Sequence, residues 1–131
     1  MPKPAKTIVC VEDEPEVIEL IQVMLETSGY RVIGVIGGRE ALEVIRREKP
    51  DMVLLDLMMP EVDGWTVFKQ MRADPELKSI PVVPVTAVDK PIDMMLALEV
   101  AGVDEYVTKP FSRSELIASV EKVFRRREGQ E

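Results

Sequence analysis

The sequence predicts an α/β fold with a doubly wound, mostly parallel sheet that is covered by helices on both faces. Short apolar runs alternate along the chain with amphipathic segments of helical period, which is the pattern of repeated strand–helix units. Several runs are apolar at successive positions, as strands buried on both faces are. The 131 residues fit one compact domain. We therefore expect a single domain over residues 1–131, with its core between about residues 7 and 124.

Five apolar runs are predicted to be strands. They occupy residues 7–11, 30–35, 52–55, 82–86 and 105–108. The run at 52–55 is the most apolar in the chain. The fourth run contains Pro84, which is unusual because proline cannot donate to a sheet ladder and normally occurs at edges and bulges.

Five further segments are predicted to be helices. Their apolar residues recur at helical spacing over residues 17–25, 41–45, 65–71, 92–101 and 116–124. The first four are expected to end at Gly29, Lys49-Pro50, Asp74-Pro75 and Gly102. Ser112 and Glu115 form a capping-box pattern, so the last helix is expected to begin there and to run to about Arg127.

The composition disfavours several classes of protein. The formal net charge of −7 disfavours a general nucleic-acid-binding surface, because phosphate backbones select basic proteins. The basic cluster Arg125–Arg127 is interpreted as a solvated helix end. Cys10 is the only cysteine, so we expect no disulfide framework, a reducing compartment and a small buried apolar residue at this position. The sequence contains neither a signal-peptide core nor an apolar stretch of about 20 residues, so we expect a cytoplasmic protein that binds no membrane.

The chain contains no histidine, which restricts its chemistry further. Histidine general bases, Ser-His-Asp triads and histidine-ligated zinc sites are excluded. Any chemistry of this chain must therefore use carboxylates, hydroxyls and amines.

Polar side chains stand at the carboxyl ends of four of the predicted strands. In chain order they are Glu12 and Asp13, Asp56, Thr86 and Lys109. Ligands of open parallel sheets bind beyond these strand ends, where the strand order reverses. Taken alone, each of these residues has an ordinary structural explanation: it is an acid in a loop, a helix cap, the end of a strand or a solvated lysine. Five such residues at strand ends are hard to arrange by chance, so we expect them to converge.

Three carboxylates in one pocket repel one another, and one would take up a proton unless a cation lay among them. Oxygen ligands without His or Cys favour a hard cation, and a sparse set of acids from different loops fits Mg²⁺ better than Ca²⁺. Thr86 and Lys109 suggest that a phosphoryl group binds in the same pocket beside the metal ion. Asp56 is then the candidate nucleophile, which would form an aspartyl phosphate.

Four segments together resemble the signature of the receiver domains of two-component response regulators. They are Val-Glu-Asp-Glu-Pro at 11–15, Leu-Leu-Asp-Leu-Met-Met-Pro-Glu-Val-Asp-Gly at 54–64, Val-Thr-Ala at 85–87 and Tyr-Val-Thr-Lys-Pro-Phe at 106–111. The resemblance runs from about Thr7 to Phe124, and the combination is specific although each piece alone is weak. It implies a flavodoxin-like doubly wound (βα)5 fold whose five-stranded parallel sheet has the strand order 2-1-3-4-5.

The resemblance also implies a phosphoacceptor and a set of metal ligands. Asp56 would accept a phosphoryl group from the phosphohistidine of a histidine kinase or a histidine phosphotransfer protein. Asp13 and Asp56 would bind Mg²⁺ through their carboxylates, Glu12 through a water molecule, and Met58 through its backbone carbonyl.

Further roles follow from the same resemblance. Thr86 would hydrogen-bond the phosphoryl group, and Lys109 would pair with it. Tyr106 would be an aromatic switch that turns inward when Thr86 moves, and Pro110 would follow a cis peptide bond. The chain would thus be a signalling switch and not an enzyme, although it would assist its own phosphorylation and dephosphorylation.

Some positions depart from the family pattern, and others are expected to set the rate at which the phosphate is lost. Glu12 stands where aspartate is common, which lengthens its reach and favours the water-mediated role. Pro84 would stiffen the segment that carries Thr86. In this family, two positions influence the rate at which the aspartyl phosphate is hydrolysed. One lies two residues after the phosphoacceptor and the other two residues after the threonine. Here they are occupied by the apolar residues Met58 and Val88. Our hypothesis is slow loss of the phosphate, because neither side chain can orient a water.

Phosphorylation is expected to change the partner preference of the face formed by the predicted fourth helix, fifth strand and fifth helix. Its candidate contact residues are Met94, Met95, Tyr106 and Arg125–Arg127. The first helix, near residues 15–23, is the expected docking surface for the kinase. The sequence neither identifies the downstream target nor decides whether a dimer forms on phosphorylation. We expect either a stand-alone regulator or an excised fragment, because no output domain follows the last helix.

Three other functions fit parts of the pattern. A flavodoxin-like electron carrier would need a phosphate-cradling loop where Glu12, Asp13 and Glu14 instead repel phosphate. A phosphotransferase like the haloacid dehalogenases would use an aspartate nucleophile, but it would have a second acid at Met58 and a cap domain. A receiver-like interaction scaffold would not need the complete set of acids, threonine and lysine, although scaffolding stays open as an additional role.

Overall fold

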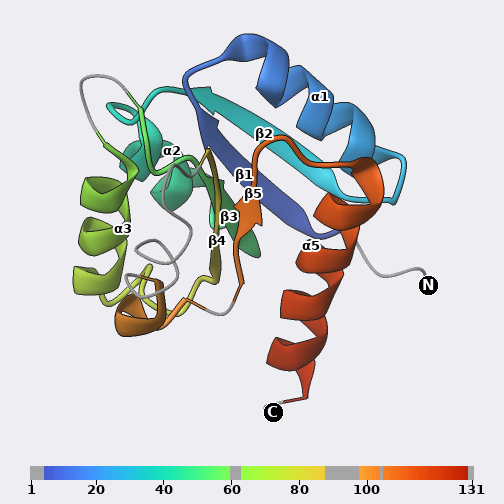
Figure 1. Ribbon diagram of the computed structural model, residues 1–131. Helices are drawn as coiled ribbons and strands as arrows, with labels where there is room; N and C mark the ends of the chain where they lie inside the picture. The colour runs from blue at the N-terminus through green and yellow to red at the C-terminus, as the bar shows by residue number, and fades with distance from the viewer. Residues whose placement is uncertain (1–4, 60–62, 88–97, 104, 130–131) are drawn as a thin grey trace.

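The structure is a computed structural model that describes residues 5–59, 63–87, 98–103 and 105–129 (Figure 1). Its elements in chain order are β1 (Thr7–Glu12), α1 (Pro15–Glu26), β2 (Arg31–Ile36), α2 (Ala41–Glu48), β3 (Met52–Leu55), α3 (Gly64–Ala73), β4 (Val82–Thr86), β5 (Val107–Thr108) and α5 (Arg113–Glu128). The strands form one parallel sheet in the order β2-β1-β3-β4-β5, which confirms the predicted fold class. Of the predicted fourth helix, residues 98–101 are helical, and the segment before them lies outside the described residues.

The helices lie in two layers, with α1 and α5 on one face of the sheet and α2 and α3 on the other (Figure 1). Alternate residues of β1 point to opposite faces. Ile8 and Cys10 belong to the core cluster on the α1 and α5 side, whereas Val9 and Val11 belong to the cluster on the α2 and α3 side. Burial raises the pKa of the Cys10 thiol to about 12, so this residue is the buried apolar side chain that was predicted.

Pro84 lies in an interior strand without removing a hydrogen bond from the described ladder. The carbonyl of Pro81 accepts a hydrogen bond from β3, and the carbonyl of Thr86 accepts one from the residue after β5. Backbone groups of alternate residues point to alternate neighbours, so the nitrogen of Pro84 faces the β5 side. On that side the pairing begins only at Val85. The proline therefore occupies a position where the ladder has no partner for its missing N–H.

The strand β5 is shorter than the run 105–108 that was predicted, and it comprises only Val107–Thr108. The carboxylate of Glu105 accepts a hydrogen bond from the N–H of Tyr106 at 3.1 Å and pairs with Lys122 of α5 at 3.2 Å. Extending the pairing by one residue would place Tyr106 opposite Pro84, which has no N–H to donate toward β5, so the strand begins only at Val107. The other four strands agree with the predicted runs to within one residue at each end.

Two helices begin at side-chain caps. The hydroxyl of Ser112 accepts the N–H of Glu115 at 3.1 Å, and the carboxylate of Glu115 accepts the N–H of Ser112 at 3.2 Å, which confirms the predicted capping box. The carboxylate of Asp63 accepts the N–H of Thr66 at 2.8 Å and caps α3. Among the described residues, no helix combines the length and the apolar character that crossing a bilayer requires.

Gly64 begins α3 at a point where the chain passes close to the end of β3. A Cβ atom at this position would lie 2.1 Å from the carbonyl oxygen of Asp56 and 2.6 Å from the Cα atom of Leu57. Both are backbone atoms, so neither can rotate away. The N–H of Gly64 donates to the carbonyl of Leu57 at 3.1 Å. The missing side chain thus allows α3 to hold the segment that carries Asp56.

Gly64→Ala should lower the free energy of unfolding by about 1–3 kcal/mol, the usual cost of forcing extra atoms into a packed site. Gly129→Ala is the control, because a Cβ there would lie 3.5 Å from its nearest neighbour, the carbonyl oxygen of Arg125. Urea unfolding measures both variants. A Gly64→Ala protein as stable as the wild type would contradict the close approach.

Candidate functional site

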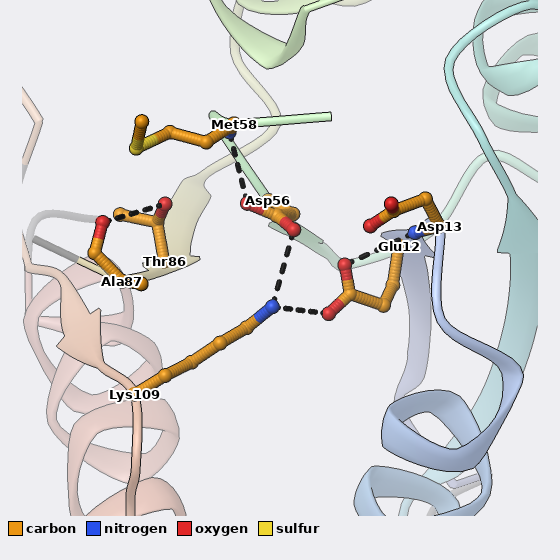
Figure 2. Close-up of polar contacts among 7 residues, drawn as sticks. All are labelled: Glu12, Asp13, Asp56, Met58, Thr86, Ala87 and Lys109. Atoms are coloured by element: carbon orange, nitrogen blue, oxygen red, sulfur yellow. Dashed lines mark hydrogen bonds and ion pairs between the residues drawn. The ribbon is translucent and has the colours of Figure 1, made fainter. Parts of the chain in front are cut away.

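The five side chains that were predicted to converge stand at the carboxyl ends of β1, β3, β4 and β5 (Figure 2). They are Glu12, Asp13, Asp56, Thr86 and Lys109. Backbone hydrogen bonds place these ends beside one another. The N–H of Asp56 donates to the carbonyl of Val11 and the N–H of Lys109 to the carbonyl of Thr86, each at 3.0 Å. The strand order therefore determines which side chains meet.

The ammonium group of Lys109 lies between two buried carboxylates. Its Nζ is 3.1 Å from Oδ2 of Asp56 and also contacts Oε1 of Glu12. The side chains of Glu12 and Asp56 are only 2% and 5% exposed. Burial alone would lower the pKa of Lys109, but its contacts with the two carboxylates raise it above the usual value. Lys109 is therefore a permanent cation at neutral pH.

The carboxylate of Asp56 is held through both of its oxygens. Oδ1 accepts the N–H of Met58 at 2.9 Å, while Oδ2 faces Lys109. Burial favours the protonated form, but the interactions with Glu12, with the Met58 N–H and with Lys109 outweigh it and lower the pKa of Asp56. Asp56 is thus ionised at neutral pH, as a carboxylate nucleophile must be.

Glu12 shows the opposite shift. Burial, aided by the neighbouring Asp56, raises the pKa of Glu12 to about 8, although Lys109 opposes this change. The Oε2 atom of Glu12 also accepts the N–H of Asp13 at 3.0 Å. Two buried carboxylates share one ammonium here, so one of them keeps a proton near neutral pH.

Thr86 is fully buried, and its hydroxyl donates to the carbonyl of Ala87 at 3.4 Å. Figure 2 shows Thr86 on the far side of Asp56 from Glu12 and Asp13. Tyr106 is half-buried and packs against the core cluster on the α2 and α3 side. The Lys109–Pro110 peptide bond is cis, as predicted.

The acidic residues form a set that fits a hard cation. Glu12, Asp13 and Asp56 each offer one carboxylate oxygen, and these oxygens lie within 4.8 Å of one another. The ammonium of Lys109 supplies one positive charge against three carboxylates, so a divalent cation would balance the pocket. The donors are all oxygens, which suits the Mg²⁺ that was predicted.

The structure places most of the predicted site residues together, and it adds contacts that were not predicted. The N–H of Met58 holds Asp56, whereas the expected role of the Met58 carbonyl toward the metal stays a prediction. Main-chain donors leave no side-chain signature, so no sequence signal could have identified this contact. Val88, Met94 and Met95 lie outside the described residues.

Comparison with known proteins assigns the family. The family model of the response regulator receiver domain matches residues 8–121. The chain is 44% identical over 123 residues to the alkaline phosphatase synthesis transcriptional regulatory protein PhoP of Bacillus subtilis. That alignment covers 94% of this chain and 50% of PhoP, so the chain spans about half the length of this relative.

Solved structures agree with this result. The BeF3-activated N-terminal receiver domain of RstA from Klebsiella pneumoniae is 38% identical with a TM-score of 0.78, over 88% of this chain and 95% of that one. The signal receiver domain of a signal transduction histidine kinase from Syntrophus aciditrophicus is 35% identical with a TM-score of 0.80, over 90% and 89%. The match to the receiver family supports a phosphorylation-dependent signalling switch of the two-component class. The chain belongs to the family of response regulator receiver domains.

In metal-free buffer, the free energy of unfolding should fall as the pH rises from about 5 to about 8. Glu12 keeps its proton to about pH 8 in the folded protein but releases it near pH 4.5 in the unfolded chain. The folded state therefore binds more protons in this window, and the slope is at most about 1.4 kcal/mol per pH unit. Glu12→Gln should remove the slope, whereas Glu19→Gln on the exposed side of α1 should keep it. Urea unfolding in a chelating buffer at several pH values measures this, and an unchanged slope in Glu12→Gln would refute the assignment.

Proposed function

We propose that Asp56 accepts a phosphoryl group from the phosphohistidine of a histidine kinase or a histidine phosphotransfer protein, with Mg²⁺ in the acid pocket. The observation that carries this proposal is the ammonium of Lys109, which lies against the buried carboxylates of Asp56 and Glu12. This arrangement keeps the nucleophile ionised and places a cation where the charge of a phosphoryl group would arrive. Membership of the receiver family supports the same assignment.

In the proposed transfer, a carboxylate oxygen of Asp56 forms a bond to phosphorus while the bond from phosphorus to the donor imidazole nitrogen breaks. The electron pair of the broken bond returns to that nitrogen, and the product on this chain is an aspartyl phosphate. Lys109 is already 3.1 Å from Oδ2 of Asp56 and would pair with the phosphoryl oxygens. The hydroxyl of Thr86 would exchange its long bond to Ala87 for one to the phosphoryl group.

The metal would be held by the residues that the structure brings together. Asp13 and Asp56 would bind it through their carboxylates, Glu12 through a water molecule and Met58 through its backbone carbonyl. When bound, Mg²⁺ neutralises charge on the phosphoryl oxygens. The chain itself would act as a phosphoacceptor that assists its own phosphorylation and dephosphorylation.

Two surfaces would connect the site to other proteins. The donor would dock on α1, where Leu20 and Val23 are 46% and 64% exposed. The output would pass through Thr86 and Tyr106 to the face formed by the fourth helix, β5 and α5. At the end of α5, Arg127 donates to the carbonyl of Ser79 at 3.2 Å, so this part of the basic cluster is already used within the domain.

Asp56→Asn should abolish phosphate incorporation from acetyl phosphate or phosphoramidate with Mg²⁺, because the amide cannot form the acyl phosphate. Asp63→Asn is the control, since Asp63 lies on the same loop, its carboxylate is exposed, and asparagine also caps helices. Mass spectrometry and the acid-stable, base-labile character of the adduct report incorporation. Equal incorporation in Asp56→Asn and the wild type would refute the proposed function.

The phosphate on Asp56 should be lost slowly, because Met58 and Val88 present no group that orients water. Met58→Asn and Val88→Glu should each accelerate the loss, by on the order of tenfold, which is less than a fully positioned acid–base group achieves. The measurement is a time course of phosphate loss after the donor is removed. Rapid loss in the wild type that neither variant changes would contradict this hypothesis.

A further inference from the structure

Met58 differs from the other methionines in the described part of the chain. Its side chain is 59% exposed. Met52 and Met71 are fully buried, Met59 is 6% exposed and Met24 is half-buried. A dissolved oxidant reaches a thioether only where the sulfur meets solvent, so Met58 is the described methionine that is most open to oxidation.

Met58 is also attached to the phosphoacceptor site through its main chain. Its N–H lies 2.9 Å from Oδ1 of Asp56. The side chains on either side of it, Leu57 and Met59, are 2% and 6% exposed. Figure 2 shows the Met58 side chain extending from this anchored point, away from the acids of β1, with its sulfur near the free end. The backbone is thus held in place beside Asp56, while the side chain that extends from it is exposed to solvent.

We propose that Met58 is a redox-sensitive modification site, at which oxidation by a peroxide to methionine sulfoxide shortens the lifetime of the phosphate on Asp56. The effect on lifetime rests on the proposed function of Asp56. The selectivity of the oxidation rests only on the exposure of Met58 and can be tested separately.

The oxidation transfers one oxygen atom and two electrons. The sulfur lone pair attacks one oxygen of hydrogen peroxide, and the S–O bond forms as the O–O bond breaks. The departing hydroxide takes the proton of the sulfur-bound hydroxyl and leaves as water. Sulfur is oxidised and the peroxide is reduced, while a methionine sulfoxide reductase, with a dithiol as reductant, reverses the change.

The sulfoxide changes what this side chain can do to water. A thioether is a weak acceptor, whereas the sulfoxide is a polar group whose oxygen accepts hydrogen bonds. Loss of the phosphate requires a water oxygen to attack phosphorus while the bond from phosphorus to the Asp56 oxygen breaks, which yields inorganic phosphate and the free carboxylate. An acceptor on the exposed side chain two residues after Asp56 can orient this water with its lone pair toward phosphorus. Since Met58 is exposed, the new polarity does not disturb the core.

The first test maps the oxidation. The native protein is treated with dilute hydrogen peroxide, and peptide mass spectrometry follows sulfoxide formation at each of the eight methionines. Met58 should be oxidised well before Met52, Met59 and Met71. Oxidation of Met58 no faster than of its sequence neighbour Met59 would overturn the proposal.

The second test times the loss of phosphate before and after peroxide treatment in the wild type, Met58→Leu and Met24→Leu. Leucine keeps the volume of methionine but cannot form a sulfoxide. Each protein is compared with its own untreated sample. The treated wild type and Met24→Leu should lose phosphate several times faster than before, treatment should not change Met58→Leu, and reductase with dithiothreitol should restore the wild-type rate. No acceleration in the wild type, or an equal one in Met58→Leu, would overturn the proposal.

The two proposals fail in different ways. An untreated wild type that takes up no phosphate on Asp56 would refute the proposed function and with it the effect of oxidation on lifetime. Normal uptake with a lifetime that oxidation does not change would refute only the role of Met58. Met58→Gln gives an independent check, because its amide oxygen supplies a polar acceptor without peroxide and should shorten the lifetime in the untreated protein.

Discussion

The structure depends on a charge imbalance that is buried at the carboxyl edge of its sheet. Glu12 and Asp56 are almost completely buried and share the single ammonium of Lys109, while Asp13 adds a third carboxylate beside them. Burying charged groups costs more free energy than an imperfect pairing returns, so this cluster does not stabilise the fold as an ordinary salt bridge would. The raised pKa of Glu12 is the direct sign of that cost. Under the proposed function, this excess of negative charge would attract a cation and then the phosphoryl group.

The rest of the fold holds this imbalance in one geometry. The order of β1, β3, β4 and β5 brings the acids and the lysine to one edge, although nearly one hundred residues separate Glu12 from Lys109 in the chain. Gly64 lets α3 lie directly against the backbone of Asp56, the proposed phosphoacceptor. Pro84 restricts the backbone of β4 two residues before Thr86, in a place where no ladder hydrogen bond is lost. Each feature limits movement of a strand end that carries part of the site.

Local patterns were enough to predict the parallel strands and the members of the pocket, because the carboxyl ends of parallel strands share an edge, whereas the strand order was implied by the resemblance to receiver domains. The contacts inside the pocket could not be predicted in the same way. That Lys109 contacts Glu12 as well as Asp56, and that the amide of Met58 holds Asp56, depends on distances set by the folded chain. The late start of β5 likewise depends on its pairing with β4, where Pro84 lies opposite the residue before β5 and has no N–H to donate. Sequence patterns encode periodicity and residue type, whereas these contacts come from tertiary packing.

The proton that Glu12 retains suggests how the pocket could bind a metal ion and a phosphoryl group without a large change in net charge. In the metal-free protein, three carboxylates are balanced by the ammonium of Lys109 and by one proton, which leaves one negative charge. A divalent cation that displaces this proton would make the pocket neutral. A phosphoryl group on Asp56 replaces that carboxylate by about two negative charges and leaves the pocket close to its starting charge. In the proposed cycle, metal binding, transfer and loss of phosphate would therefore change the net charge of the pocket little, and Lys109 already lies between Glu12 and the oxygen of Asp56.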